Sequence, residues 1–391
     1  MGTEQNLIRI ESALKENYLP AFVNMLGVEP SAVLSKIKKV PLDSQKFVGV
    51  APVGLSGGFG FSGEGLETPE AGYVEHQKFF AEAKDMYVNV EISAKAVRLT
   101  GTAGSMVNAL DTEIKAAYET AKWNMGRALF GNGTGILTTI QALSPAGNTI
   151  KVNDTSFVKE GLIIDVYEKN GDIPVAKGIR IKAVDRINNT ITVSGAARTY
   201  NEGFITVQKS YKKEITGIGA IFDDNIDTIW GVSKKDNPFI KPIVTSADGV
   251  ISDGIITKTL RMAERDKGSN VNMLLCGDTA YDEYVDYLRT NNIRVENMTK
   301  EITGGFKAIS FAFGNREVEI VNEGFVPANE MWGVDTDALE MHQQEWEFEQ
   351  LKGGGIFNLM EGKSVYRALL SNYGELICKK PGGCVRITNV A

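Results

Sequence analysis

The sequence has little histidine and little cysteine, and this scarcity removes several kinds of catalytic and metal site. It contains two histidines and three cysteines among 391 residues. Two histidines cannot form a three-histidine metal site, and neither has an H-E-x-x-H partner. His76 and His342 stand in polar stretches, so we expect both on the surface. Three cysteines without a C-x-x-C pair argue against structural zinc and a disulfide framework. We expect unpaired thiols at Cys276, Cys378 and Cys384.

An excess of basic residues is also lacking, and so is a long apolar run. Lysine and arginine number 42 against 49 acidic residues, which gives a net charge of −7. A dedicated nucleic-acid binder would normally be basic. The longest stretch without charge, residues 128–150, is broken by glycine, proline and asparagine, so it is not a membrane helix. No secretory signal opens the chain. We expect a soluble protein of two or three domains.

No catalytic or phosphate-binding motif stands in the context that its chemistry requires. Residues 58–63 read GFGFSG and match G-x-G-x-x-G. In a dinucleotide site a helix begins within this motif and holds the pyrophosphate, but no helix pattern follows here. Residues 131–135 lack the lysine of a P-loop, and no serine lies in G-x-S-x-G. We therefore expect no enzyme, no cofactor and no metal.

Acidic and aromatic residues alternate near the C-terminus. In a strand, one face would carry the carboxylates and the other face the rings. The carboxylates could form a cation site or an acid–base pair. The favoured interpretation is a half-buried strand with a solvated acidic face, because no partner that would shift their pKa values is visible. The carboxylates are Glu345, Glu347 and Glu349, and the rings are Trp346 and Phe348.

The first half of the chain combines a glycine-rich segment with one long helix. Residues 49–65 read GVAPVGLSGGFGFSGEG and hold apolar side chains with few local partners, which is typical of a binding surface. The alternative is a loop that folds onto its own domain. A strand is expected around residues 87–92, and a helix over 105–130 with Ser105 as its cap. The apolar positions of this helix are Val107, Leu110, Ile114, Ala121 and Met125.

The second half alternates between short strands and helices. Strand and turn signals over 147–211 predict a small antiparallel barrel or sandwich inserted into the chain. A helix should run from Ser252 to Gly268, followed by a buried strand at 271–276 and a helix after Gly277. Residues 306–321 predict a hairpin, and residues 346–391 are strand-like again.

The order of these parts resembles the major capsid protein of tailed bacteriophages, which has the Hong Kong 97-like α+β fold. The passage VNVEISAKAVRLTG, leading into the long helix, carries most of the resemblance. The resemblance implies an N-terminal arm at 1–44, an extended loop at 45–92 and a peripheral domain at 93–146. The spine helix of that domain would be at 105–130. An inserted β-barrel-like domain would occupy 147–211. A mainly axial domain would follow at 212–345, and 346–391 would return to the peripheral domain.

The same resemblance implies a structural protein that assembles into pentamers and hexamers. These would form the icosahedral head shell around double-stranded DNA, without sequence-specific binding or membrane contact. A scaffolding protein, a portal and a decoration protein are the implied partners, and the host bacterial cytoplasm is the implied place of assembly. The contact candidates on the extended loop are Leu55, Phe59, Phe61, Glu64, Leu66 and Lys78.

Some members of that family form covalent Lys–Asn cross-links between subunits. Lys78 or Lys84 with Asn358 would be the residues concerned, but no local signature supports the reaction and we expect none.

Two alternatives stay open. An encapsulin, a cellular compartment shell of the same fold, would hold cargo in place of DNA, and the predicted insertion favours a phage capsid. The other alternative is a multidomain enzyme or ligand-binding protein that uses residues 58–65. A specific small ligand and the lack of large assemblies would support that second alternative.

Overall fold

The computed structural model describes residues 19–20, 26, 30–42, 44–53, 57–65, 67–95, 103–141, 144–291, 299–302, 306–350 and 355–391. The chain divides into two compact units. The barrel unit comprises Met1–Pro30, Lys84–Ala220 and Trp346–Asn372. The hairpin unit comprises Ser31–Ala83, Ile221–Glu345 and Tyr373–Ala391. The finer division into six segments stays a prediction.

A long amphipathic helix, α5 (Ala103–Phe130), organises the first core of the barrel unit. It begins two residues before Ser105, so the expected cap is wrong, and it ends where the sequence predicts. Ile114 and Met125 are buried and Ala121 packs at the edge of this core. Val107 and Leu110 lie on the part of α5 whose side chains are outside the description. The strands beside this core are β4 (Lys84–Ser93), β22 (Glu347–Phe348), β23 (Phe357–Leu359) and the first half of β24 (Val365–Cys378).

The second part of the barrel unit is a closed antiparallel barrel. Its strand order is β5-β12-β8-β9-β10-β7. The two ends meet at the Ile140–Val152 bridge, and the amide of Asn153 donates to the carbonyl of Thr139 at 2.9 Å. The interior is filled by aliphatic side chains from every strand of the barrel. The bounds are β5 (Ile136–Ile140), β7 (Thr149–Lys151), β8 (Ile163–Glu168), β9 (Ala176–Asp185), β10 (Thr190–Val193) and β12 (Gly203–Val207), with β6 (Ser144–Gly147) and β11 (Arg198–Tyr200) pairing beside it.

The strands expected within 147–211 are therefore present, but the barrel begins earlier, at Ile136. Its chain ends lie side by side, since the amide of Lys212 donates to the carbonyl of Thr134 at 2.8 Å. The barrel shares one compact unit with α5, so its standing as a separate inserted domain stays a prediction.

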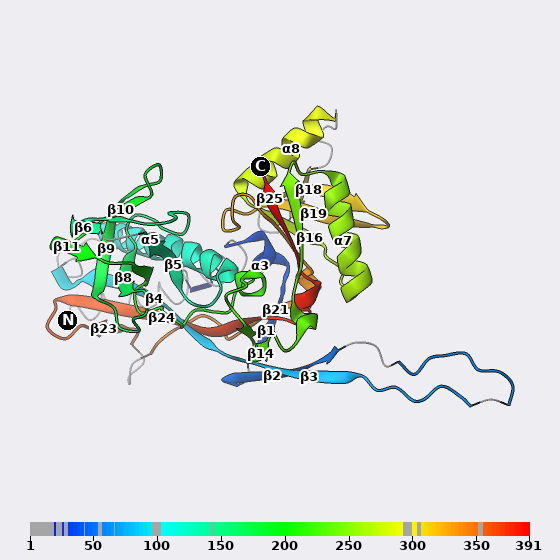
Figure 1. The fold of residues 1–391 in the computed structure, drawn as a ribbon. Coiled ribbons are helices and arrows are strands. Elements are labelled where there is room, and N and C mark those ends of the chain that lie inside the picture. Colours follow the sequence, from blue (N-terminus) through cyan, green and yellow to red (C-terminus); the bar gives the residue numbers. More distant parts are fainter. Residues whose placement is uncertain are drawn as a thin grey trace. The chain divides into compact units, whose positions relative to one another are not determined.

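The hairpin unit is built on a seven-stranded sheet of order β15-β25-β20-β16-β19-β18-β17. Helices α7 (Asp253–Lys267) and α8 (Asp278–Thr290) contribute to one core on this sheet (Figure 1). Ser252 and Gly268 flank α7 as predicted, and Gly268 has the left-handed φ of 60° that ends a helix. The strands are β15 (Ile243–Gly249), β16 (Met273–Cys276), β17 (Thr299–Ile302), β18 (Phe306–Phe313), β19 (Arg316–Asn322), β20 (Met331–Val334) and β25 (Val385–Val390).

The remaining elements of the hairpin unit are short, apart from one hairpin. Strand β1 (Lys38–Pro41) pairs with β21 (Leu339–Gln343), and β21 pairs with the second half of β24. The long hairpin consists of β2 (Lys46–Val53) and β3 (Glu75–Glu82). The short elements are α3 (Ala32–Lys36), β13 (Thr228–Ile229), β14 (Val232–Ser233) and three 3₁₀ turns at Pro238–Ile240, Thr336–Ala338 and Pro381–Gly383. Helix α6 (Gly219–Phe222) lies where the chain passes between the units.

Candidate assembly surface

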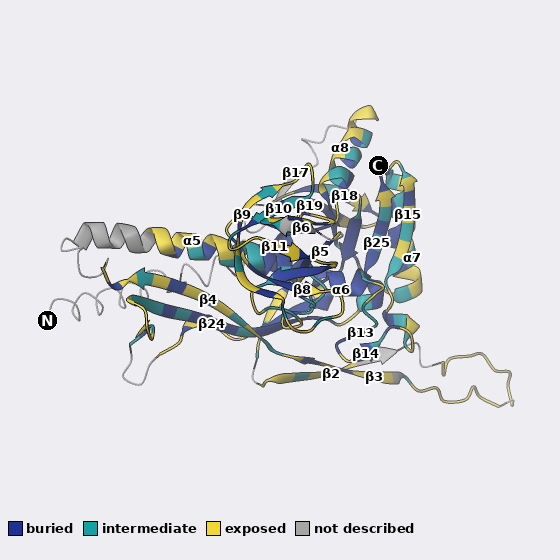
Figure 2. Cartoon of the chain, turned by 60° about the vertical axis from the view of Figure 1, so that its left-hand side comes forward, coloured by how far each residue is buried: buried dark blue, intermediate teal, exposed yellow. Residues whose placement is uncertain are grey.

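The chain continues beyond the ladder of the β2–β3 hairpin as an extension with two sides and a tip. The register of the ladder runs from Lys46–Glu82 to Val53–Glu75. Residues 57–65 and 67–74 then run on without helix or strand, as the hairpin in Figure 1 shows. Almost all of these residues are exposed, which Figure 2 shows in yellow. A helix does not begin at residues 58–63, so the G-x-G-x-x-G match has no phosphate-binding geometry.

Glycine lets the two sides of this extension approach each other closely. A Cβ atom on Gly58 would lie 2.8 Å from the amide nitrogen of Gly72, and one on Gly60 would lie 2.9 Å from Cγ of Pro69. The hydroxyl of Ser62 donates to the carbonyl of Glu67 at 2.7 Å and ties the two sides together near the tip. Glycine at these positions therefore allows the two sides to lie close together and form a narrow, extended arm.

The arm presents aromatic rings to solvent. Phe59 is 84% exposed, Phe61 is 94% exposed, and Tyr73 is 84% exposed. The rings of Phe59 and Phe61 meet edge to face at 5.4 Å, so they form one small apolar patch. In the described residues this loop does not fold onto its own unit, contrary to the alternative raised by the sequence. Phe59 and Phe61 are thus available for contact with another molecule.

The other contact candidates fall in two groups. Glu64 and Lys78 are exposed, and Lys78 lies on β3. Leu55 and Leu66 lie outside the described residues. Val48, Val50 and Phe80 were not singled out by the sequence, yet they are 61%, 54% and 42% exposed on the hairpin. The alternation of Val48 and Val50 along β2 was the signal that could have identified these two residues, and Phe80 lies opposite Val48 on β3.

The base of the hairpin is held firmly within its unit. The amide of Phe80 donates to the carbonyl of Trp230 at 2.9 Å, and Nε1 of Trp230 donates to the carbonyl of Leu376 at 2.8 Å. The Phe47 ring lies 4.3 Å from the ring of His342, centroid to centroid. An anchored base and a free arm together make a structure that can reach another molecule.

His342 is buried, and the surface position expected for it is wrong. It is 4% exposed, and its Nε2 lies 3.1 Å from Oε2 of Glu340. Burial alone would raise the pKa of Glu340, but hydrogen bonds from Lys379 and His342 hold it below its usual value. The polar neighbours of His342 in the sequence gave no sign of the Phe47 ring that covers it.

A second buried polar contact holds the start of the hairpin unit on its sheet. Glu323 is 7% exposed and accepts a hydrogen bond at 3.0 Å from the hydroxyl of Ser31, which also caps α3. Burial raises the pKa of Glu323 to about 7, against the opposing effect of the hydrogen bonds from the Ser31 hydroxyl and the Phe325 amide. Nearby, Lys36 forms an ion pair with Glu319. No feature of the sequence identified these residues.

The remaining sequence candidates form no catalytic arrangement within the described residues. Trp346 and Phe348 are buried while the three glutamates beside them are exposed, as predicted. His76 is exposed. All three cysteines are free and buried, and burial raises the pKa of Cys276, so its thiol stays protonated.

Two further observations concern metals and membranes. In the part of the chain that the structure describes, no group of three or more histidine, cysteine or acidic residues could hold a metal ion. Across the same described residues, no helix combines the length and the apolar character needed to span a bilayer.

Comparison with known proteins gives a structural match only. No protein-family model matches the chain, and no curated protein sequence matches it. Among solved structures, the chain is similar to the capsid asymmetric unit of cyanophage A-1(L), with a TM-score of 0.53 at 12% identity. That match covers 94% of this chain and 93% of the other.

Two further solved structures are similar to this chain at lower TM-scores. The SrpI encapsulin of Synechococcus elongatus PCC 7942 matches with a TM-score of 0.49 at 8% identity, over 93% of this chain and 88% of the other. The satellite phage P4 procapsid structure, which includes the size determination protein, matches with a TM-score of 0.46 at 9% identity, over 100% and 98% of the two chains. The chain has the fold of a phage capsid protein, as its resemblance to tailed-phage coat proteins implied.

Proposed function

We propose that this chain is the major capsid protein of a tailed bacteriophage. Copies of it assemble into pentamers and hexamers, and these close into an icosahedral shell around double-stranded DNA. The chain has a structural role without catalysis. Its place is the virion, after assembly in the host bacterial cytoplasm with a scaffolding protein, a portal and, in some heads, a decoration protein.

The observation that carries this proposal is the anchored arm with an exposed Phe59–Phe61 patch, on a chain with a capsid-protein fold. A shell protein needs contacts between unlike surfaces of neighbouring copies, because such contacts close into rings. An arm that projects apolar rings away from its own base supplies one side of such a contact. The net charge of −7 also fits a container that must not hold the phosphates of packaged DNA tightly.

The test replaces both rings, as Phe59→Ser with Phe61→Ser. Both side chains are exposed in the single chain, so thermal unfolding of the subunit should not change. Shell formation, seen by negative-stain electron microscopy and analytical ultracentrifugation, should be lost. The matched control is Ile187→Ser, since Ile187 is 93% exposed on a turn of the barrel and should tolerate serine without loss of shells.

The outcomes separate the possible functions. Closed shells for the unaltered protein and none for the double variant support the proposal. Unaltered protein that stays a monomer at every concentration, with or without scaffold, contradicts it. Shells that enclose a cargo protein and no DNA when purified from their natural host identify an encapsulin.

A further inference from the structure

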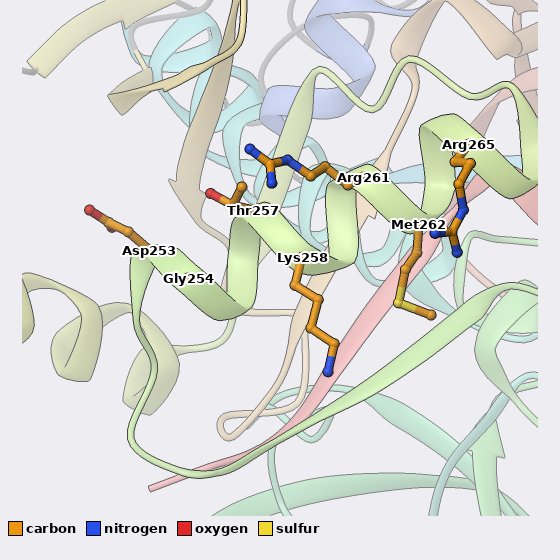
Figure 3. Close-up of a pocket in the computed structure, with 7 residues that line it drawn as sticks. All are labelled: Asp253, Gly254, Thr257, Lys258, Arg261, Met262 and Arg265. Carbon is orange, nitrogen blue, oxygen red and sulfur yellow. The ribbon is translucent and has the colours of Figure 1, made fainter.

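The outer face of α7 carries a row of positive charges. Lys258, Arg261 and Arg265 are exposed and project from the helix (Figure 3). They lie opposite Ile256, Leu260 and Ala263, which are buried in the core of the sheet. A shallow hollow of about 580 Å³ lies along this face, and Met262 adds an apolar wall to it.

The outer face of α8 carries negative charges in a matching row. Asp278, Asp282 and Asp286 are exposed at intervals of four residues. Ala280, Tyr284 and Leu288 face the core from the opposite side of the helix. The two helices belong to one body, because the hydroxyl of Tyr284 lies 3.1 Å from Oδ1 of Asp253 on α7. Every copy of the chain therefore displays both rows.

Several of these charges have no partner within the chain. Arg265 pairs with Asp266 at 2.7 Å, and Asp286 pairs with Arg289 at 3.1 Å. Among the described residues, no ion pair or hydrogen bond occupies the side chains of Lys258, Arg261, Asp278 and Asp282. The helix dipole accounts for an aspartate at the first position of α8. It does not account for two unpaired cations in the middle of α7.

We infer that the basic face of α7 docks on the acidic face of α8 in the next copy of the chain. The inference rests on the proposed function, and it names a surface that joins subunits within one ring. Two different surfaces of each copy meet in this contact, so it repeats head to tail, which is the kind of contact that builds a ring when the rotation between copies closes. Opposite charges on the two faces orient the subunits and disfavour a contact between two like faces. Because the charges are exposed, the contact weakens as salt rises.

The test reverses the charge of each face separately. One variant carries Lys258→Glu and Arg261→Glu, and the other carries Asp278→Lys and Asp282→Lys. In either variant both faces have the same sign, so we expect the ring fraction in sedimentation velocity to fall about tenfold or more. The matched control for the α7 variant is Lys177→Glu with Lys182→Glu, at two exposed positions on β9. It changes the net charge as the α7 variant does and should leave ring formation unchanged. Thermal unfolding checks that each variant is folded.

An equimolar mixture of the two variants gives the sharpest readout. Each chain can then bind only the other variant, so chains must alternate around a ring. Rings with an even number of subunits should return, while pentamers cannot form. Six-membered rings without closed shells are therefore expected by electron microscopy.

Three results overturn the inference. In the first, either variant alone forms rings like the unaltered protein. In the second, the mixture fails to restore rings although both variants are folded. In the third, the α7 variant assembles normally but loses binding to a double-stranded DNA fragment, which makes the face a nucleic-acid surface. Failure of the unaltered protein to form any ring would instead remove the proposed function, and this inference with it.

Discussion

At the scale of single residues, Glu323 carries the clearest electrostatic cost in the hairpin unit. Glu323 is 7% exposed, and among the described residues its carboxylate accepts hydrogen bonds from the hydroxyl of Ser31 and the amide of Phe325. Burial penalises the charged form more than these donors favour it, so the pKa rises from 4.5 to about 7. The folded state therefore binds a proton more tightly at this site than the unfolded state does.

The variant Glu323→Gln should remove this cost. With a raised pKa in the folded state, the site's contribution to stability is complete below pH 4.5 and is lost between pH 4.5 and about 7. At pH 8 the variant should be more stable than the unaltered protein by about 3 kcal/mol. At pH 4 the two should be nearly equal. Chemical unfolding of the hairpin unit at a series of pH values measures the difference.

The control for this experiment is Glu70→Gln, at an exposed carboxylate of the same unit. It should show no such difference at any pH in the series. A difference between Glu323→Gln and the unaltered protein that stays constant from pH 4 to pH 8 would show that burial does not raise this pKa.

At the scale of elements, local patterns predicted the three long helices and about half of the strands in the described residues. The apolar spacing of α7 and the glycine after it predicted both ends of this helix. The Gly314-Asn315 turn predicted the β18–β19 hairpin. These features depend on neighbours within a few residues, so the sequence shows them directly. The predicted start of α5 differs from the observed start by two residues. No side chain near that start marks it as strongly as glycine marks the C-terminal end of a helix.

One buried carboxylate joins three segments of the barrel. The two oxygens of Asp165, on β8, accept hydrogen bonds at 2.8 Å from the amides of Gly178 and Lys209. Both donors have positive φ, 64° at Gly178 and 61° at Lys209, so Asp165 holds two left-handed bends in place. Asp165 is 3% exposed, so these hydrogen bonds lie in a low-dielectric environment that strengthens them.

The variant Asp165→Asn keeps the shape but turns one acceptor into a donor. One backbone N–H group then faces an NH₂ group, which leaves a buried donor unpaired. We expect a loss of about 1–3 kcal/mol in the free energy of unfolding, measured in denaturant. The control Asp172→Asn changes an exposed carboxylate and should cost under about 0.5 kcal/mol. Equal stability of both variants would show that Asp165 does not fix the bends.

At the scale of the whole molecule, the barrel is a closed body whose two chain ends adjoin. Lys212 and Thr134 share a backbone hydrogen bond, and a Cβ atom on Gly135 would lie 2.6 Å from the carbonyl oxygen of Ser210. Domains whose ends lie this close are easily inserted into or removed from a host chain. The α5 side chains Ile114 and Tyr118 pack in a separate core with β4 and the C-terminal strands.

Replacing residues 136–210 with a short glycine-serine linker should therefore leave a folded protein. Circular dichroism should keep the helical signal and lose strand signal, with some loss of stability because Trp123 packs partly against the barrel core. Replacing 147–211, the boundaries expected from the sequence, should instead cause aggregation. This replacement leaves β5 without its neighbouring strands and exposes Leu137 and Ile140. The exposure costs about 1.5–3 kcal/mol for each side chain. Unfolding of the first variant would show that the barrel is integral to its unit.

The sequence by itself determined the three long helices, many of the strands, the β-rich character of residues 147–211 and the resemblance to a capsid protein. Each of these depends on spacing along the chain or on the order of segments. Only the tertiary structure decided which polar groups are buried. Ser31 and Glu323 meet across 292 residues, Phe47 covers His342, and β5 closes the barrel against Val152. Burial and pKa depend on such distant neighbours, and no local pattern specifies them.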